Sequence, residues 1–458
     1  MRRVLARTCG LLASWLLVAA CQAADKPNIL FLVGDDMGYA DVGFHGCTDI
    51  PTPNLDAFAK SSVRFTNGYV SGPYCSPTRA GLLTGRYQTR FGHEFNPGGE
   101  GGAGESGLPV SETLIPARLK TAGYSTALVG KWHLGSKPQF HPQQRGFDEF
   151  FGFLGGAHDY FNANGILRGN EPAGTKEYLT DVIGRESVKF IESHKGQPWF
   201  LYVAFNAVHT PMQADDARLK KFESIADEKR RTYAAMMFAM DEAIGKILTS
   251  LDESGQAKNT LVTFISDNGG PTMNGTTTNG SVNKPFRGSK RTTLEGGIHV
   301  PFLVRMPGVQ PGVFEQPVIQ LDLTATALAT AGVDTSSAKL DGVDLRPHLT
   351  GSTKKPPHEA LYWRFGQQMA IRDGNLKLVR YDSNADTNTG KGGQPVTEFQ
   401  LYDLASDPGE SKDLAATMPA KVKELQAKWD SWNKENVDPL WGAAGGGKGK
   451  GRRANAAE

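Results

Sequence analysis

The sequence alternates short apolar runs with longer amphipathic stretches, and this alternation constrains the fold more than any other feature. The apolar runs are rich in β-branched residues and lie at 28–34, 125–130, 199–205, 261–266 and 301–306. Amphipathic helices are expected between them, the longest over 227–255. Strands that alternate with helices pack as a parallel sheet covered by helices on both faces. The pattern therefore predicts an α/β protein with a large, mostly parallel central sheet.

The pattern changes after about residue 340. Two segments, 360–382 and 398–404, have the composition of antiparallel strands, and 419–436 has that of a helix. We therefore predict a main domain over 25–340 and a smaller C-terminal subdomain of antiparallel sheet plus helix over 341–441. The remaining residues, 442–458, are rich in Gly, Lys and Arg and are predicted to be a disordered basic tail.

The N-terminus, residues 1–24, has the three parts of an export signal: a basic start, an apolar run too short to span a membrane, and small residues. The segment VAAC at 18–21 resembles a bacterial lipoprotein cleavage box, which would leave Cys21 as a lipid anchor. Ordinary cleavage near Ala23 is the alternative. We expect an exported bacterial protein that is periplasmic, anchored in the outer membrane or secreted.

The formal net charge of +2 comes from the two termini, and the body between them is net negative. A protein that binds nucleic acid needs a broad basic surface, so this balance argues against a nucleic-acid partner. An anionic ligand would have to be bound by a few local groups.

Acidic and amide side chains follow two of the predicted strands. Asp35 and Asp36 come directly after the first strand, and Asp267 and Asn268 follow the strand at 261–266. Ligands of parallel α/β sheets gather beyond the carboxyl ends of the strands. An acidic residue after a strand is more often a helix cap or a turn former, but two such pairs at equivalent places favour a site made of oxygen ligands. That chemistry suits Ca²⁺, or with less support Mg²⁺, rather than Zn²⁺.

Groups that are cationic, or become so on protonation, lie at other strand ends. Lys131 and His133 are two apart after the strand at 125–130, His209 follows the strand at 199–205, and Lys290 precedes a Gly-rich turn. Singly, each is more often a solvated or hydrogen-bonded surface residue. Together with Arg79 they would hold a tetrahedral oxyanion ester and protonate its leaving group. This set predicts hydrolysis of a sulfate or phosphate ester.

A cysteine, Cys75, precedes a predicted helix in which Ser76 is the expected N-cap and Pro77 lies in the first turn. This places Cys75 just outside the positive end of a helix dipole. A disulfide with Cys47 is the structural alternative for an exported protein, but the residues around Cys75 argue against it.

The segment Cys75-Ser76-Pro77-Thr78-Arg79 resembles the C-x-P-x-R maturation motif of the sulfatases, a branch of the alkaline phosphatase superfamily. Further segments resemble the family in the same order, from 27 to about 415, including PNILFLVGDDMGYADVG, GYSTALVGKWHLG, SDNGG and GSKRTTLEGG. The arylsulfatase A and N-acetylgalactosamine-6-sulfatase branch is the most similar in appearance. The resemblance implies an alkaline-phosphatase-like fold and hydrolysis of sulfate monoesters, on a sulfated glycan or an aryl sulfate.

The resemblance also implies how position 75 is used. In the family a formylglycine-generating enzyme converts this cysteine into Cα-formylglycine, whose hydrate is the nucleophile. The implied Ca²⁺ ligands are the derivative of Cys75 and four strand-end residues, Asp35, Asp36, Asp267 and Asn268. The maturing enzyme is thus an implied partner, together with the sulfated substrate.

The implied catalytic roles fall on six residues. Cys75 supplies the nucleophile, which Arg79 orients, and Lys131 and Lys290 grip sulfate oxygens. His209, with Lys290, protonates the leaving alcohol. His133 then takes a proton from the second hydroxyl, and sulfate is expelled.

Three positions depart from the usual family pattern. One is Thr78, which replaces the commoner serine and is expected still to permit maturation. Ala157 stands where relatives often have a serine, so His158 is a candidate for substrate binding, with a structural hydrogen bond as the alternative. His299 stands where an arginine is common and is given no role. Two other functions remain open: a phosphate or phosphonate ester hydrolase of the same superfamily, and a non-catalytic, surface-anchored glycan-binding protein.

Overall fold

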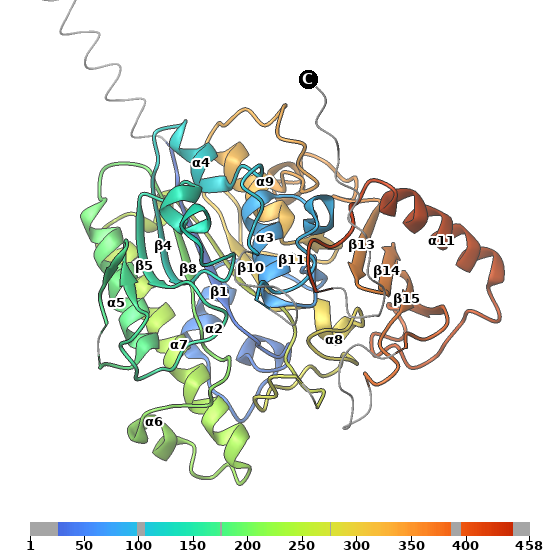
Figure 1. Cartoon of the computed structure of the whole chain (residues 1–458), viewed down its shortest axis with the longest axis horizontal. Helices are drawn as coiled ribbons and strands as arrows, with labels where there is room; N and C mark the ends of the chain where they lie inside the picture. Colours follow the sequence, from blue (N-terminus) through green and yellow to red (C-terminus); the bar gives the residue numbers. More distant parts are fainter. Residues whose placement is uncertain (1–25, 99–105, 175, 275, 386–394, 443–458) are drawn as a thin grey trace, which may run out of the picture.

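The computed structural model describes residues 26–98, 106–174, 176–274, 276–385 and 395–442. The predicted export signal, the Cys21 anchor and nearly all of the predicted basic tail lie outside these residues. A ten-stranded sheet forms the centre of the molecule, with helices on both faces and a smaller lobe at one side (Figure 1). The strands that make up this sheet, in spatial order, are β11 (Gly312–Phe314), β2 (Val63–Phe65), β10 (Phe302–Arg305), β9 (Thr260–Ser266), β1 (Asn28–Gly34), β8 (Trp199–Ala204), β4 (Ser125–Lys131), β5 (Glu149–Phe153), β6 (Leu167–Arg168) and β7 (Glu171–Pro172).

Alternate residues of the central strand β1 pack into two different cores. Ile29 and Phe31 face one core, to which three helices contribute: α3 (Cys75–Thr84), α4 (Ile115–Lys120) and α9 (Leu321–Thr330). Leu30 and Leu32 face the other, covered by α2 (Pro53–Lys60), α5 (Leu179–Ser193) and α7 (Glu228–Glu253). Because successive side chains of a strand point to opposite faces, an unbroken apolar strand is what a sheet covered on both faces requires.

The sheet is parallel at its centre and mixed at its edges. β9, β1, β8, β4 and β5 are parallel neighbours, which confirms the predicted α/β architecture. β10 runs antiparallel to β9. Between these two strands the chain forms a long loop whose helix α8 (Glu295–Ile298) has only four residues. In the described part of this loop, no long helix returns the chain to the opposite end of the strands. β10 therefore starts at the end of the sheet where β9 stops, and runs antiparallel to it.

Residues 341–441 contain a second, antiparallel sheet of four strands. These are β13 (Ala360–Phe365), β14 (Gln368–Asp373), β15 (Leu376–Arg380) and β16 (Gln400–Asp403). One face of this sheet packs against α11 (Pro419–Asn433) through Met369, Ile371 and Leu425. The opposite face carries Ala370 and Val379, which belong to the core of the main domain. The small sheet is thus held between α11 and the main domain (Figure 1).

The remaining elements are short. A two-stranded sheet pairs β12 (Val318–Ile319) with β3 (Gly68–Tyr69), and two more helices are α6 (Asp216–Lys221) and α10 (Arg346–Leu349). The described residues also form five 3-10 turns: η1 (Gly43–His45), η2 (Gln88–Phe91), η3 (Pro138–Phe140), η4 (Pro142–Arg145) and η5 (Ala257–Asn259). Among the described residues, no helix is both long and apolar enough to cross a membrane.

Candidate active site

Cys75 is the first residue of α3 rather than the residue before it. The extended residue Tyr74 is the N-cap and caps with no side-chain bond, so the prediction that Ser76 is the N-cap was wrong. The Ser76 hydroxyl instead donates to the carbonyl of His133 at 2.6 Å and lies 2.6 Å from Nε2 of His93. The hydroxyl therefore ties the start of the helix to the loop after β4. Cys75 and Cys47 are both free, so the alternative of a disulfide is not realised.

The acidic residues that follow β1 and β9 lie side by side. The two strands are parallel, and Gly34 pairs with Ser266 in their register, so both pairs begin at the same level of the sheet. The backbone N–H of Asp36 donates to Oδ1 of Asp267 at 3.3 Å. The Sγ of Cys75 lies 3.5 Å from Oδ1 of Asp35 and 3.9 Å from Oδ1 of Asp36. The structure thus brings the predicted nucleophile and the predicted metal ligands together, and all are fully buried.

The residues present fit a hard divalent cation. Ligand atoms of Asp35, Asp36, Cys75 and His209 all lie within 4.8 Å of one another. Asn268 adds an amide whose Nδ2 donates to Asp36 at 2.8 Å, while its Oδ1 is buried without a hydrogen-bond partner. A buried polar oxygen without a partner is costly, and a cation would satisfy it. The oxygen-rich donor set matches Ca²⁺ or Mg²⁺.

Three cationic side chains are interleaved with the three carboxylates. The Lys131 ammonium lies 2.5 Å from Asp35, and that of Lys290 lies 2.8 Å from Asp36. The Arg79 guanidinium donates to Asp267 from Nε at 3.0 Å and from Nη2 at 2.7 Å. Burial and the neighbouring Asp267 raise the pKa of Asp35 to about 7. Burial also acts to raise the pKa of Asp36, but Lys290 and His209 outweigh it and lower that pKa.

Two histidines complete the cluster. Nε2 of His209 lies 3.6 Å from Asp36, and its Nδ1 lies 2.7 Å from the carbonyl of Thr210. His133 has a buried Nδ1 without a hydrogen-bond partner. Burial lowers the pKa of His209 to about 3, and burial together with the neighbouring Lys131 lowers that of His133 well below its usual value. Both shifts favour the neutral form of the ring.

A pocket of about 450 Å³ opens onto this cluster. His133, His209 and Lys290 line it, whereas Lys131 and Arg79 are fully buried. Its other lining residues come from several loops and are Tyr74, Asn96, Pro97, Gly98, Gly156, Ala157, Thr276, Thr277 and Arg291. A buried group of acids, cations and histidines at the floor of an open pocket is an arrangement for binding and cleaving a small oxyanion ester.

Comparison with known proteins agrees with this arrangement. A family model described as Sulfatase matches residues 27–333, which is more than half of the chain. The chain belongs to the sulfatase family. A second model, described as N-sulphoglucosamine sulphohydrolase, C-terminal, matches residues 288–433. The molecule is therefore a sulfuric ester hydrolase of alkaline-phosphatase-like fold. Of the functions that the sequence left open, family membership favours sulfate ester hydrolysis.

Individual sulfatases are similar over most of the chain. Human N-acetylgalactosamine-6-sulfatase is 38% identical over 454 residues, which cover 87% of this chain and 83% of the relative. Bovine arylsulfatase A is 33% identical over 458 residues, covering 90% of this chain and 88% of the relative. The crystal structure of Ps i-CgsB has a TM-score of 0.82 and 35% identity, and covers 91% of this chain and 95% of its own. The expected likeness to the arylsulfatase A and N-acetylgalactosamine-6-sulfatase branch is confirmed.

His158 of this sulfatase does not line the pocket. Its Nδ1 lies 2.6 Å from the carbonyl of Asp159, and its Nε2 lies 2.7 Å from the carbonyl of Asn164. The His158 ring thus stabilises its own loop by hydrogen bonding. This agrees with the structural hydrogen bond that was the alternative to substrate binding. His299 is also structural, because its ring bridges Glu295 at 2.9 Å and the carbonyl of Thr66 at 2.9 Å.

Thr277 belongs to the site, although it is not among the residues predicted from the sequence. Its hydroxyl donates to Asp36 at 2.9 Å and accepts from Lys290 at 3.2 Å. Thr277 lies in a Thr- and Asn-rich loop, and no local pattern distinguishes it from Thr276, which also lines the pocket. Asn96 also belongs to the site, since its Oδ1 accepts from the N–H of Ser76 at 3.1 Å, but it precedes a Gly-rich run and no local pattern indicates this contact.

Strained backbone conformations are concentrated at this site. In the described residues, five residues other than glycine have a positive φ: Asp36, His133, Arg291, Lys339 and Glu410. The first three have φ values of 61°, 61° and 73° and either line the pocket or form its buried floor. Side chains disfavour this left-handed conformation, which is maintained where the surrounding structure fixes it and is concentrated at functional sites.

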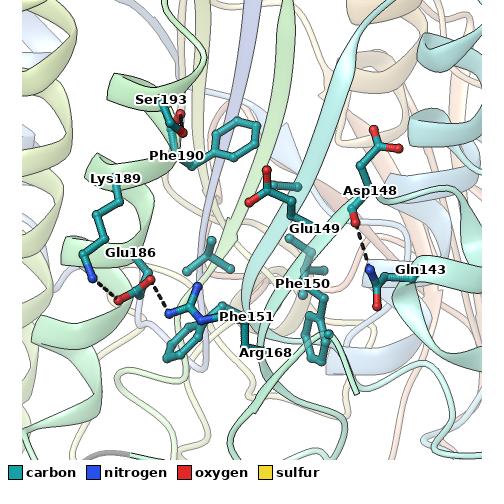
Figure 2. A pocket seen from close by; sticks show the side chains of 14 residues that line it. Gln143, Asp148, Glu149, Phe150, Phe151, Arg168, Glu186, Lys189, Phe190 and Ser193 are labelled. Atoms are coloured by element: carbon teal, nitrogen blue, oxygen red, sulfur yellow. Dashed lines mark hydrogen bonds and ion pairs between the residues drawn. The ribbon is translucent and has the colours of Figure 1, made fainter. Parts of the chain in front are cut away.

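A second hollow, of about 480 Å³, lies between β5 and α5 (Figure 2). The Glu186 carboxylate in it accepts from Arg168 at 2.7 Å and from Lys189 at 2.8 Å. The two acids on the opposite side are also paired, Asp148 with Lys120 at 2.6 Å and Glu149 with His194 at 3.4 Å. The three acids of this hollow therefore all have partners.

Proposed function

We propose that this sulfatase removes sulfate from a sulfated glycan, with Cys75 in its formylglycine form and Ca²⁺ as the cofactor. Relatives support the substrate class: one is named for N-acetylgalactosamine 6-sulfate, and Ps i-CgsB has been crystallised with k-i-k-neocarrahexaose. That complex has a TM-score of 0.81 and 35% identity to this chain. An exported enzyme, as predicted from residues 1–24, would meet such a substrate outside the cytoplasm.

The observation that carries the proposal is the place of Cys75. A free cysteine in the sulfatase maturation motif lies at the start of a buried helix, against two carboxylates and below a pocket with two histidines and a lysine. As the hydrated aldehyde, this residue would supply one hydroxyl as the nucleophile and a second hydroxyl that permits sulfate to leave by elimination.

Four residues would hold the cation: Asp35, Asp36, Asp267 and Asn268. Calcium would supply positive charge among the carboxylates and favour a deprotonated oxygen at position 75. Arg79 is buried and does not line the pocket, and its two hydrogen bonds to Asp267 fix the orientation of that carboxylate. Arg79 is therefore proposed to position the site as well as to balance its charge.

The pocket side chains are proposed to handle the sulfate and the protons. Lys290 lines the pocket, and Lys131 lies beside Asp35 in the cluster next to it. Their positive charges would bind sulfate oxygens. His209 presents Nε2 on the side of Asp36. Together with Lys290 it would protonate the leaving oxygen, once the negative charge of the bound sulfate raises the pKa of the ring so that Nε2 carries a proton. His133 would accept the proton that is lost when sulfate departs.

The test is sulfate release from a panel of oligosaccharides, followed by ion chromatography. The panel contains N-acetylgalactosamine 6-sulfate, neocarra-oligosaccharides and heparan-type disaccharides, with 4-nitrophenyl sulfate as the aryl reference. We expect kcat/KM for at least one glycan sulfate to exceed the aryl value by about 100-fold or more, since remote contacts with a true substrate stabilise the transition state. Hydrolysis of the aryl sulfate alone would contradict a glycan substrate.

The export signal, the lipid anchor at Cys21 and the maturing enzyme as a partner remain predictions. The first two fall on residues 1–25, outside the described residues. The domain limits 25–340 and 341–441 also remain predictions.

A further inference from the structure

The chain on either side of Lys290 is bound by the C-terminal subdomain. Before Lys290, Arg287 donates to the carbonyl of Glu410 at 2.7 Å and contacts the hydroxyl of Tyr381. After it, the hydroxyl of Thr293 donates to the carbonyl of Arg380 at 3.1 Å. Among the described residues of the C-terminal subdomain, none lines the active-site pocket. In the part of the subdomain that the structure describes, contact with the site is therefore made through segments such as this one.

Gln368, in the C-terminal subdomain, hydrogen-bonds to the segment that follows Lys290. Its Nε2 donates to the carbonyl of Arg291 at 2.8 Å, and its Oε1 accepts from the N–H of Thr293 at 3.2 Å. Gln368 begins β14 and shares a strand face with Ala370, which packs into the core of the main domain. The side chain therefore points toward the loop that carries Lys290, and it is only 7% exposed.

The residue that Gln368 binds has a disfavoured conformation. Arg291 has a φ of 73°, and its N–H donates to the carbonyl of Pro73, two residues before Cys75, at 2.7 Å. Both the N–H and the carbonyl of this left-handed residue are therefore fixed by partners outside its own segment. The turn that results presents Lys290 to Asp36 at 2.8 Å and brings the Lys290 ammonium to within 5.4 Å of the centre of the Tyr74 ring.

We propose that Gln368 is a positioning residue of the sulfatase reaction. By holding the backbone at Arg291 and Thr293, its amide sets the left-handed turn and so places the Lys290 ammonium beside Asp36 and Cys75. The C-terminal subdomain thereby takes part in catalysis without touching the substrate in this pocket. The inference rests on the role of Lys290 under the proposed function.

A double-mutant cycle separates positioning from general stability. Gln368→Met keeps the volume and removes both bonds, and Lys290→Ala removes the group that is positioned. We expect Gln368→Met to lower kcat/KM for 4-nitrophenyl sulfate about tenfold, and Lys290→Ala to lower it about 100-fold. In the Lys290→Ala background, Gln368→Met should cause less than a twofold further loss. An equal tenfold loss in both backgrounds would overturn the inference.

The control is Asp413→Ala, which loosens the same subdomain elsewhere. Asp413 accepts from the N–H of Leu401 at 3.0 Å and that of Ala415 at 2.8 Å, both within the subdomain. We expect it to lower the melting temperature and leave kcat/KM within twofold of wild type. A tenfold loss in this variant would show that any loosening of the subdomain impairs the enzyme and would overturn a specific role for Gln368.

Three other results are possible: a Gln368 variant that does not fold, unchanged activity in the Gln368 variant, and unchanged activity in Lys290→Ala. If Gln368→Met does not fold, Gln368→Glu replaces it, because Glu still accepts from Thr293 while its oxygen repels the carbonyl of Arg291. Wild-type kcat/KM in the Gln368 variant beside an impaired Lys290→Ala overturns the inference alone. Wild-type kcat/KM in Lys290→Ala overturns the proposed role of Lys290, and the positioning role with it.

Discussion

The ammonium of Lys290 lies 2.8 Å from the carboxylate of Asp36, although 254 positions separate the two residues. Asp36 follows the central strand β1, whereas Lys290 lies in the long loop between β9 and β10. Their contact lies on the side of the Cys75 cluster that faces the pocket, because Lys290 lines that pocket. The active site is thus assembled from both ends of the main domain.

Removal of the thiol at position 75 tests the nucleophile. Cys75→Ala should abolish sulfate release while the protein remains folded, because the change removes only the formyl group of the matured residue, or the thiol of unconverted protein, and costs about 1 kcal/mol of unfolding free energy. Thermal melting and sulfate release on the same preparation measure both effects. Turnover close to wild type in this variant would contradict the proposed mechanism.

The proton donor is tested by the choice of leaving group. His209→Ala should lower kcat/KM more for a sugar sulfate, whose alcohol leaves only when protonated, than for 4-nitrophenyl sulfate, whose phenolate leaves readily. We expect a loss of 10²–10⁴-fold, of the order usual for general acids, for the sugar and about tenfold or less for the aryl ester. The His158→Ala variant is the matched control, since that ring binds backbone carbonyls outside the pocket. Equal losses for both substrates in His209→Ala would exclude His209 as the acid.

Calcium binding is testable without turnover. After treatment with EDTA, added Ca²⁺ should raise the melting temperature, because a ligand at 100 times its Kd stabilises the folded state by about 2.7 kcal/mol. Asn268→Ala removes the unpaired amide oxygen and should weaken the Ca²⁺ midpoint at least tenfold. Asp344→Ala, which removes an acid paired with Arg346 instead, should leave the midpoint unchanged. An Asn268→Ala midpoint equal to that of wild type would remove Asn268 from the ligand set.

A buried histidine outside the site makes stability depend on pH. Nε2 of His358 lies 2.8 Å from the Asp322 carboxylate, and although burial opposes it, this contact raises the pKa of His358 above its ordinary value. The folded pKa thus exceeds the unfolded one. The stabilisation is complete below the unfolded pKa of about 6.5 and is lost as pH rises through the folded pKa.

Urea unfolding of wild type and His358→Gln measures this effect. The difference in unfolding free energy between them should be largest near pH 5.5 and should shrink as the pH is raised to 9. Each unit of pKa shift corresponds to about 1.4 kcal/mol of that difference. A difference that is constant across this range would show that the His358–Asp322 contact does not depend on the charge of the histidine.

The sequence was sufficient for the parts of the site that follow strands. Asp35, Asp36, Asp267 and Asn268 could be placed together because parallel strands end at one edge of a sheet. Cys75, Lys131 and His209 were found by motif and by their position after strands. Because these features are local in sequence, one chain is enough to detect them.

Features that depend on tertiary packing were not predictable. The antiparallel direction of β10 follows from the path of a long loop. The start of α3 at Cys75 follows from bonds of Ser76 to His93 and His133, which lie far along the chain. Thr277 and Gln368 act through contacts with the loop of Lys290, and nothing in their neighbouring residues indicates those contacts.

The most direct test of the account is the mass of the tryptic peptide Phe65–Arg79, from protein purified from its native host. We predict the mass of a peptide with an aldehyde in place of the Cys75 thiol, with sulfate release in proportion to the converted fraction. An unmodified thiol in protein that is fully active would contradict the formylglycine mechanism.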